Sequence, residues 1–401
     1  MSNIFFRFVP IIFLPFLISS CGVTFPQPNS LISNDASTDG ISSIFNSSSE
    51  MIDVLCDCCN SLFSVEPKYL DNYLKAPHIC CDCNLKLVND DSINYLFITD
   101  IHADNEEQAK ATNSLLTNVV EYLNNYDGID FLCIGGDLTS LYFENETEWT
   151  LWIEKLLSPL KKCKKPLFIL NGNHDDNSNW NSSVNQDTAF IVSPKKFNEI
   201  VLNKFVNVDI MHDEDYYNSE YYYYDLCKNG TRYRIVCLDS NDCPEHRNNS
   251  WYWGFTERQI KWLKNVVFTD NNCKYVVLSH MSIEQRFNVC QTVVHYEKEV
   301  KDIIESFYNK YDLLVHSFGH LHLELLMKND FGLPYSCTTT LFKGGVNSKF
   351  DGQQIYEELN DKSIEYETID KTLIDYSYDL LSVNGLSVKR FAVGAGKNKE
   401  I

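Results

Sequence analysis

The chain has 401 residues, of which 44% are hydrophobic and 22% charged, with only 11 Pro and 16 Gly. This composition is globular and excludes disordered, collagenous and coiled-coil proteins. The 34 basic and 55 acidic residues give a formal net charge of −21. Such a chain repels polyanions, which argues against a nucleic acid polymer as partner. A small phosphate-bearing substrate requires bound metal to reverse the local charge.

The first 50 residues have the pattern of an exported protein. Arg7 precedes an apolar run over 8–18, which is too short for a membrane span but has the length of a signal-peptide core. Residues 1–21 are therefore predicted to be a signal peptide, and their end also resembles a bacterial lipobox, in which Cys21 is lipidated. The polar residues 22–50 are expected to form a flexible linker. A cleaved signal peptide would give a secreted protein, and lipidation of Cys21 would give a protein anchored at the cell surface, so both place the mature protein outside the cytoplasm. The lipid anchor is the only membrane contact that we expect.

Residues 51–89 form a cysteine-rich module. It contains six cysteines: Cys56, Cys58, Cys59, Cys80, Cys81 and Cys83. Two C-x2-C pairs have the spacing of the knuckles that close a tetrahedral thiolate site in a zinc ribbon. The candidate ligands of this structural zinc are Cys56, Cys59, Cys80 and Cys83. The alternative is a disulfide knot, because an exported protein meets an oxidising compartment and the adjacent cysteines exceed what a ribbon needs.

The main domain is predicted over 93–370 from the alternation of short apolar runs with amphipathic stretches. Strands are expected at 93–99, 129–134, 166–170, 221–226, 233–238, 274–278, 313–317, 323–328 and 335–340. Helices are expected at 106–125, 146–160, 195–204, 256–266 and 297–308. A last strand pair is predicted around Asn360-Asp361, and residues 371–401 are interpreted as a C-terminal tail of little pattern. Alternating elements followed by consecutive strands indicate an α/β (α+β) fold with two packed sheets and helices outside.

Polar residues follow five of the predicted strands. In chain order they are Asp100 and His102, Asp137, Asn173 with His174 and Asp175, His280, and His320 with His322. Ligands bind beyond the carboxyl ends of strands in such sheets, so these turns are expected to converge on one site. The Asp-x-His and His-x-His spacings turn both polar residues the same way if the backbone is extended. Seven nitrogen and oxygen donors are too many for one ion and suit two ions bridged by one carboxylate.

These blocks, D-x-H, G-D, G-N-H-D, H and G-H-x-H in that order, resemble the calcineurin-like metallophosphoesterase superfamily over residues 93–346. The resemblance implies a four-layer β-sandwich flanked by helices. It also implies that Asp100, His102 and His322 hold one divalent metal ion, that Asn173, His280 and His320 hold a second, and that Asp137 bridges them. Manganese, iron and zinc all suit this ligand set.

Two departures from the superfamily's patterns argue against two of its branches. Protein Ser/Thr phosphatases carry an arginine where this chain has Asn171, and purple acid phosphatases carry a tyrosine where it has Ser140. The remaining resemblance is to the phosphodiesterase-like branch.

The mechanism implied is in-line attack on phosphorus by a metal-bridging hydroxide, since two cations lower the pKa of a bridging water. His174 is the candidate that protonates the leaving group, and Asp175 either orients His174 or caps a helix. The predicted function is a phosphodiesterase acting on a small-molecule phosphoester or a lipid headgroup. The alternatives are a phosphomonoesterase of the same superfamily and an inert metal-binding scaffold that recognises a partner.

Overall fold

The chain divides into two compact units, Met1–Ser48 and Ser49–Ile401, and the computed structural model describes residues of the second. The described residues are 52–56, 59, 61–65, 79, 81–177, 190–242, 252–287, 293–311, 313–342, 357–366, 376–385 and 387–401. The predicted signal peptide 1–21, the linker 22–50 and Cys80 lie outside them. Among the described helices, none combines the length and apolar character needed to span a bilayer.

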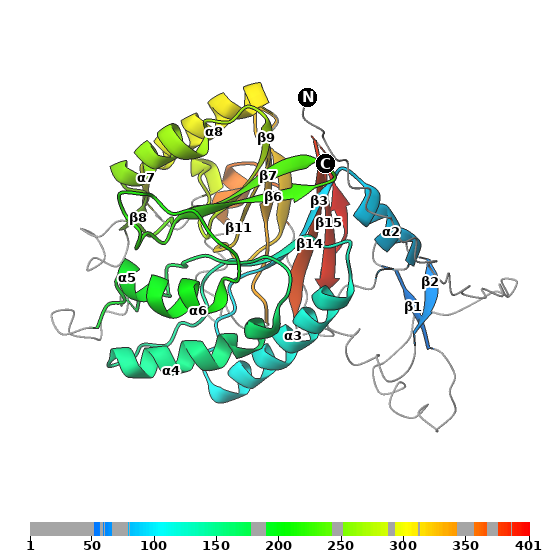
Figure 1. Ribbon diagram of the computed structural model, residues 1–401, viewed down its shortest axis with the longest axis horizontal. Helices are drawn as coiled ribbons and strands as arrows, with labels where there is room; N and C mark the ends of the chain where they lie inside the picture. The colour runs from blue at the N-terminus through cyan, green and yellow to red at the C-terminus, as the bar shows by residue number, and fades with distance from the viewer. Residues whose placement is uncertain are drawn as a thin grey trace, which may run out of the picture. The chain divides into compact units, whose positions relative to one another are not determined.

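The first six-stranded sheet carries the strand that begins the main domain. Its strands, in spatial order, are β16 (Lys399–Glu400), β15 (Ser387–Gly394), β14 (Ser377–Asn384), β3 (Ile93–Ile98), β4 (Phe131–Ile134) and β5 (Leu167–Ile169). Strands β3, β4 and β5 are parallel, whereas β14 pairs with β3 antiparallel (Figure 1). Every residue of β3 and β4 is buried, as expected for parallel strands that are covered on both faces.

The second six-stranded sheet has a parallel centre and antiparallel edges. Its strands, in spatial order, are β12 (Leu325–Lys328), β13 (Pro334–Cys337), β11 (Leu313–Phe318), β9 (Cys273–Leu278), β7 (Thr231–Cys237) and β6 (Tyr222–Lys228). The predicted hairpin is confirmed, because β6 and β7 meet at Asn229 and Gly230, with φ of 49° and 79°. Two consecutive positive φ angles define the type I′ turn that Asn-Gly favours.

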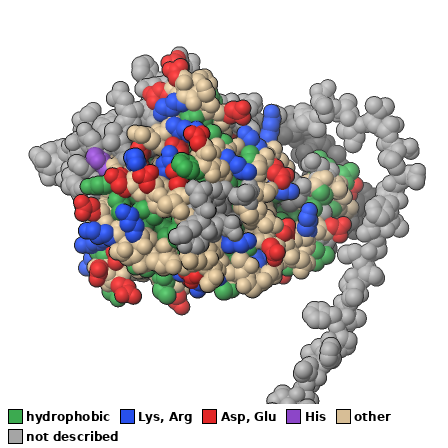
Figure 2. Space-filling view, turned by 90° about the horizontal axis from the view of Figure 1, so that it is seen from above, with side chains coloured by type: hydrophobic (Ala, Val, Ile, Leu, Met, Phe, Trp, Pro, Cys, Tyr) green, Lys and Arg blue, Asp and Glu red, His purple; other side chains and the backbone are tan. Residues whose placement is uncertain are grey.

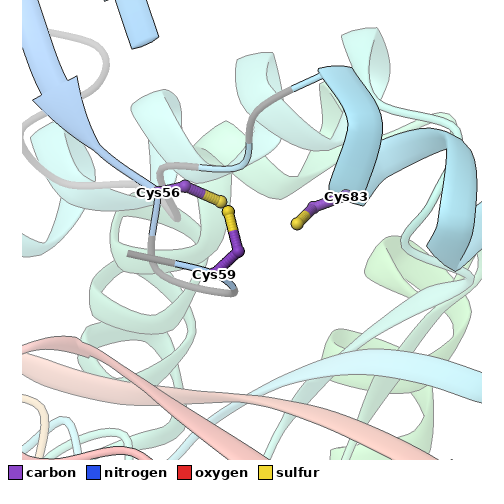
Figure 3. A group of neighbouring side chains, drawn as sticks. All are labelled: Cys56, Cys59 and Cys83. Carbon is purple, nitrogen blue, oxygen red and sulfur yellow. The ribbon is translucent and has the colours of Figure 1, made fainter. Parts of the chain in front are cut away.

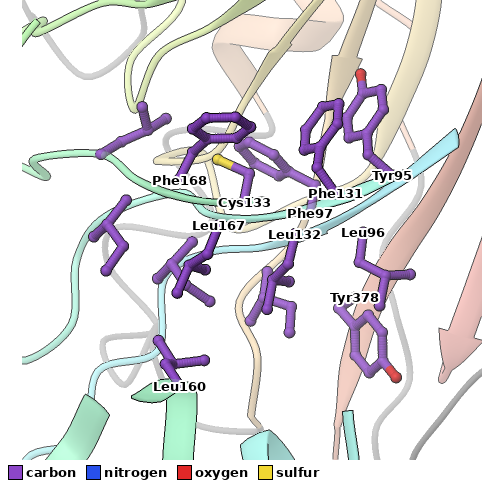
Figure 4. Close-up of a cluster of buried hydrophobic side chains, with 14 of the residues drawn as sticks. Tyr95, Leu96, Phe97, Phe131, Leu132, Cys133, Leu160, Leu167, Phe168 and Tyr378 are labelled. Carbon is purple, nitrogen blue, oxygen red and sulfur yellow. The ribbon is translucent and has the colours of Figure 1, made fainter. Parts of the chain in front are cut away.

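The first sheet turns an aromatic face toward the second sheet and a leucine-rich face away from it (Figure 4). Figure 4 shows Phe97, Phe131 and Phe168 on one face of the first sheet and leucines on the other. This separation follows from the alternation of side chains along a strand. The aromatic face meets the second sheet, where Tyr95 Oη lies 2.7 Å from Ser317 Oγ and the ring of Phe168 lies 6.5 Å from that of Tyr222. The two sheets therefore form a sandwich.

Helices cover the two outer faces of this sandwich. They are α3 (Glu106–Asn125), α4 (Glu146–Leu157), α5 (Pro194–Phe197), α6 (Asn203–Phe205), α7 (Glu257–Trp262) and α8 (Glu297–Tyr311). A 3-10 turn extends α4, and π turns follow α5 and α7. α3 and α4 begin at asparagine caps, where Asn105 and Asn145 accept hydrogen bonds from Gln108 N and Glu148 N. Figure 1 shows α3 and α4 beside the first sheet and α7 and α8 beside the second, which confirms the four-layer arrangement.

The cysteine-rich segment adds a small element pair at the start of the described chain. β1 (Ile52–Leu55) and β2 (Leu62–Val65) form an antiparallel pair, and helix α2 (Cys81–Asn89) leads into β3. A second small sheet pairs β8 (Tyr252–Gly254) with β10 (Val293–His295) in parallel. The sequence patterns predict neither this sheet nor α2.

The predicted C-terminal tail is wrong for residues 377–400. Strands β14, β15 and β16 lie within this range, and all of β14 except Asn384 is buried. The hairpin signal is Asn384-Gly385, with Gly385 at φ 57°, between two eight-residue strands. The strand pair predicted around Asn360-Asp361 is also wrong, because residues 357–361 are helical. Asn-Asp is a weaker turn signal than Asn-Gly, and at these positions the helical conformation prevails.

Candidate metal centre

The residues predicted as metal ligands lie at one edge of the sandwich, beyond the carboxyl ends of parallel strands. In chain order they follow β3 (Asp100, His102), β4 (Asp137), β5 (Asn173), β9 (His280) and β11 (His320, His322). Backbone hydrogen bonds tie these turns together across the edge. Asp100 N donates to Gly136 O at 3.0 Å, and His320 N donates to Asp100 Oδ2 at 3.0 Å. The two sheets therefore contribute to a single site.

Most of these residues have a left-handed backbone, so the Asp-x-His and His-x-His pairs do not meet the condition of an extended backbone. The positive φ angles are 50° at Asp100, 45° at His102, 53° at Asp137, 66° at His320 and 56° at His322. Such conformations cost free energy in non-glycine residues and cluster at functional sites. Hydrogen bonds at the sheet edge hold these turns in place.

The first group of donors contains Asp100, His102, Asp137 and His322, whose ligand atoms all lie within 4.8 Å of one another. His322 Nε2 lies 3.1 Å from both Asp100 Oδ1 and His102 Nε2. Asp137 Oδ2 lies 3.7 Å from His102 Nε2. All four side chains have at most 15% relative exposure, so they form a largely dehydrated cluster.

The second group shares Asp137 and adds His280 and His320. Asn173 Oδ1 joins it, at 2.9 Å from both His280 Nε2 and His320 Nδ1. His280 Nε2 lies 3.3 Å from Asp137 Oδ2, the same oxygen that faces His102. Asp137 is therefore the one carboxylate common to both groups, as a bridging ligand must be.

The hydrogen bonds of His280 indicate that the centre fits a cation. Its Nδ1 lies 2.8 Å from Gly135 O, a carbonyl that can only accept, so Nδ1 carries a proton and Nε2 faces the site. Nε2 in turn faces Asn173 Oδ1 and Asp137 Oδ2, which are both acceptors. Only a positive charge stabilises acceptors that converge in this way: a proton on His280, or a metal ion in its place. The donor set therefore suits a cation at this point.

The protonation states in the site also suit metal binding. Burial and the charge of His322 lower the pKa of His102 to about 3. Burial raises the pKa of Asp137, but the charges of His280 and His174 outweigh it and hold this pKa well below its usual value. For His280, burial opposes the charged form, whereas Asp137 raises its pKa to about 10. A neutral imidazole and an ionised carboxylate are the forms that bind metal, and His280 has to release a proton to do so.

His174 lies beside Asp137, the carboxylate common to both groups. Its backbone N–H donates to Asp137 Oδ1 at 2.9 Å, and its Nε2 lies 3.8 Å from Asp137 Oδ2. Its ring packs edge-on against that of His102 at 5.2 Å, and the side chain keeps 14% exposure. The imidazole is therefore close to the metal ligands and still reachable from solvent.

The sequence leaves Asp175 either to orient His174 or to cap a helix, and the hydrogen bonds of its carboxylate go instead to backbone N–H groups of two turns. Its carboxylate is fully buried and accepts three backbone hydrogen bonds, from Asp137 N, Leu138 N and Gly172 N at 2.8–2.9 Å. Burial and the charge of Asp137 raise the pKa of Asp175 to about 7. The side chain joins the turn after β4 to the turn after β5, so Asp175 is a positioning residue.

Two supporting contacts are not apparent from the sequence. Ser140 Oγ lies 2.5 Å from His102 Nδ1 and fixes the orientation of this imidazole. Under the turn that carries His322, the buried guanidinium of Arg390 lies 3.0 Å from Glu324 Oε2 and 3.9 Å from Asp379 Oδ1. Arg390 and Asp379 belong to strands that replace the predicted C-terminal tail.

A separate group of thiols lies in the cysteine-rich segment. The sulfur atoms of Cys56, Cys59 and Cys83 lie within 4.8 Å of one another, turned toward a common point (Figure 3). Hydrogen bonds from Ser61 lower the pKa of Cys59 to about 6. The structure brings together three of the four predicted zinc ligands, and the fourth, Cys80, lies outside the described residues.

Comparison with known proteins gives the same assignment as this geometry. The family model of calcineurin-like phosphoesterases matches residues 93–324. A probable cyclic nucleotide phosphodiesterase of Coxiella burnetii is 23% identical over 215 residues, which cover 51% of this chain and 82% of the relative. A dimetal phosphatase from Danio rerio superposes with a TM-score of 0.51 at 13% identity, covering 78% of this chain and 99% of the other, and so shares the fold. The chain therefore belongs to the calcineurin-like phosphoesterase family and is a metal-dependent phosphoester hydrolase.

Proposed function

We propose that the protein is a phosphodiesterase that hydrolyses small-molecule phosphodiesters with two divalent ions, Mn, Fe or Zn. The observation that carries the proposal is the convergence of six donors around a seventh, Asp137, with His174 Nε2 3.8 Å from the same carboxylate. Asp100, His102 and His322 would hold one ion, and Asn173, His280 and His320 the other. When bound, two cations neutralise the phosphoryl oxygens and acidify water to supply the nucleophile.

The charges around the site favour a diester over a monoester. Among the residues that the structure describes, the ion-pair partners of Asp100 and Asp137 are all histidines, and none is a lysine or an arginine. A phosphomonoester carries close to two negative charges near neutral pH, and a phosphodiester carries one. Two carboxylates paired only with histidines, on a chain of net charge −21, suit the substrate with the smaller charge.

The chain's own residues supply the proton that the leaving alkoxide needs. His174 Nε2 lies 3.8 Å from Asp137 Oδ2 and is reachable from solvent, so His174 would be the residue that donates a proton to the leaving oxygen of a phosphoryl group held at the metal centre. Imidazole donates a proton effectively near neutral pH. The hydrogen bond from the backbone N–H of His174 to Asp137 Oδ1 fixes the backbone from which the imidazole projects. Asp175 keeps the two turns in register by accepting N–H groups from both.

The comparison with the Coxiella burnetii relative supports the diester assignment, since that protein is described as a probable cyclic nucleotide phosphodiesterase. At 23% identity this support concerns the class of bond and does not extend to a particular nucleotide.

The test compares a diester with a monoester on the full chain loaded with Mn²⁺. We expect kcat/KM for bis-p-nitrophenyl phosphate to exceed that for p-nitrophenyl phosphate several-fold. Asp137→Asn, prepared in parallel, controls for contaminating phosphatases and should lose both activities. A preference for the monoester would contradict the proposal and assign the protein as a phosphomonoesterase. Metal loading without turnover of either substrate would favour an inert scaffold.

A further inference from the structure

We propose that Cys56, Cys59 and Cys83 are ligands of a structural zinc ion that joins the β1–β2 hairpin to helix α2, separate from the hydrolytic centre. The three sulfur atoms come from two elements: Cys56 and Cys59 follow β1, whereas Cys83 lies in the first turn of α2 (Figure 3). Distant cysteines brought together in this way, in a C-x2-C knuckle facing a helix, have the arrangement of a thiolate zinc site.

The spacing of the sulfur atoms suits zinc. They lie within 4.8 Å of one another. A tetrahedral zinc ion with Zn–S bonds of about 2.3 Å separates its sulfur ligands by roughly 3.8 Å, so the cluster needs to contract by no more than about 1 Å. Cys83 lies at a helix N-terminus, where the helix dipole stabilises a thiolate.

The helix that carries Cys83 is fastened to the main domain at its other end. Leu87 is 8% exposed within the core cluster, and its carbonyl accepts hydrogen bonds from Asn94 Nδ2 and Lys228 Nζ, both at 3.1 Å. Gly128 N donates to Asn84 Oδ1 at 3.1 Å. Asn94 lies in β3, the strand that ends just before Asp100. A zinc ion on Cys83 would thereby connect the hairpin to a helix that is already part of the main fold.

A buried core does not explain why the hairpin stays folded. β1 and β2 have four residues each, and Leu55 and Leu62, which are cross-strand partners, are 55% and 66% exposed. An isolated two-stranded hairpin is marginal in water, and small modules with too little core are commonly held by metal or disulfides. The thiol cluster is where such a cross-link would form.

The test uses cobalt as a spectroscopic probe in the full chain. Thiolate–Co²⁺ coordination gives an intense near-ultraviolet charge-transfer band, whereas the hydrolytic centre has no cysteine among its donors and gives none. We expect the band in the wild-type protein and in Asp137→Asn, and its loss in Cys59→Ser and Cys83→Ser. Cys227→Ser, which changes an exposed cysteine of β6, is the matched control and should keep it.

A second measurement needs no variant, in case Cys59→Ser fails to fold. A mercurial thiol reagent added to the native zinc-loaded protein should release one zinc ion together with the reaction of the cluster thiols, while the metals needed for hydrolysis stay bound. The proposal is overturned if the cobalt band is absent from the wild type or unchanged in Cys59→Ser. It is also overturned if the protein from its native compartment has these cysteines oxidised and no zinc at this site. Hydrolysis by the wild type is expected in either case, so failure here leaves the proposed function standing.

Discussion

At the scale of single residues, the position of His174 separates a proton donor from a metal ligand. Its Nε2 faces Asp137 at 3.8 Å, and seven other donors are available for the two proposed metal ions. His174→Ala should therefore retain both metals. General acid catalysis contributes about 10²–10⁴-fold. We expect a loss of kcat in that range for a substrate with a poor alcohol leaving group, and a much smaller loss for bis-p-nitrophenyl phosphate, because p-nitrophenolate departs without a proton.

Metal analysis and steady-state kinetics on the two substrates check this prediction. Asp137→Asn is the contrasting variant: it weakens the bridge between both ions, so metal content and activity should fall together. An equal loss of kcat on both substrates, or loss of metal from His174→Ala, would show that His174 is a ligand or a structural residue.

Gly172 illustrates how closely the backbone approaches the bridging ligand. A Cβ atom at this position would lie 2.1 Å from Asp137 N and 2.2 Å from Asp137 Oδ1, so Gly172→Ala must displace Asp137. We expect this variant to fold and to lose most of its bound metal and turnover. The control is Gly230→Ala in the β6–β7 turn, where a Cβ atom meets nothing within 4 Å. Gly230 also has a positive φ, so this variant strains the backbone of the hairpin without touching the metal centre. Unchanged metal affinity in Gly172→Ala would contradict the close approach of the two turns.

The sequence is most informative where chemistry and spacing coincide. All seven donors of the candidate centre were predictable, because each follows a strand-like apolar run and mixed nitrogen and oxygen donors suit Mn, Fe and Zn. The role of Asp175 was not predictable, since a carboxylate next to a histidine can orient it or bind backbone N–H groups. The choice depends on which turn packs against it, and here three backbone donors surround the buried carboxylate.

At the scale of elements, the C-terminal strands support the turn after β11. Arg390 on β15 is fully buried and forms an ion pair with Glu324, which follows the ligand His322 by two residues. Arg390→Met removes the cation from buried carboxylates, which typically costs about 3–5 kcal/mol. We expect a loss of that size in the free energy of unfolding, measured by denaturant titration.

The neighbouring residue of the same strand provides the control. Lys389 is 44% exposed and forms an ion pair with Glu400 at 3.4 Å, so Lys389→Met should cost less than about 1 kcal/mol. If Arg390→Met were as mild as Lys389→Met, the buried pair would contribute no net stability and β15 would be held by packing alone.

These same strands show why element prediction failed at the end of the chain. Strand β14 is buried on both faces, so it lacks the alternation of apolar and polar residues that marks a half-buried strand. Its pairing with β3 joins segments almost three hundred residues apart, for example Leu381 with Tyr95, which no local pattern can reveal. The elements from β3 to β5 were predictable because strand and helix alternate along this part of the chain.

At the scale of the whole molecule, the net charge opposes the substrate that the site attracts. The formal charge is −21, and two divalent ions would offset only four of these charges. Acidic and basic side chains are interspersed over the face in Figure 2, so the repulsion of an anion arises from the summed charge of the protein. Long-range repulsion of this kind slows the encounter with an anionic substrate.

Salt should therefore raise kcat/KM for a phosphodiester substrate. The Debye length falls from about 30 Å at 0.01 M to about 8 Å at 0.15 M ionic strength, so salt screens the distant acidic residues more than the metal ions that contact the phosphoryl group. We expect kcat/KM for bis-p-nitrophenyl phosphate to rise over this range while kcat at saturating substrate changes little, because the effect is on encounter. The measurement requires the metals to be fully loaded at each salt concentration. A fall of kcat/KM with added salt would show that local attraction by the metal centre outweighs the net charge of the chain.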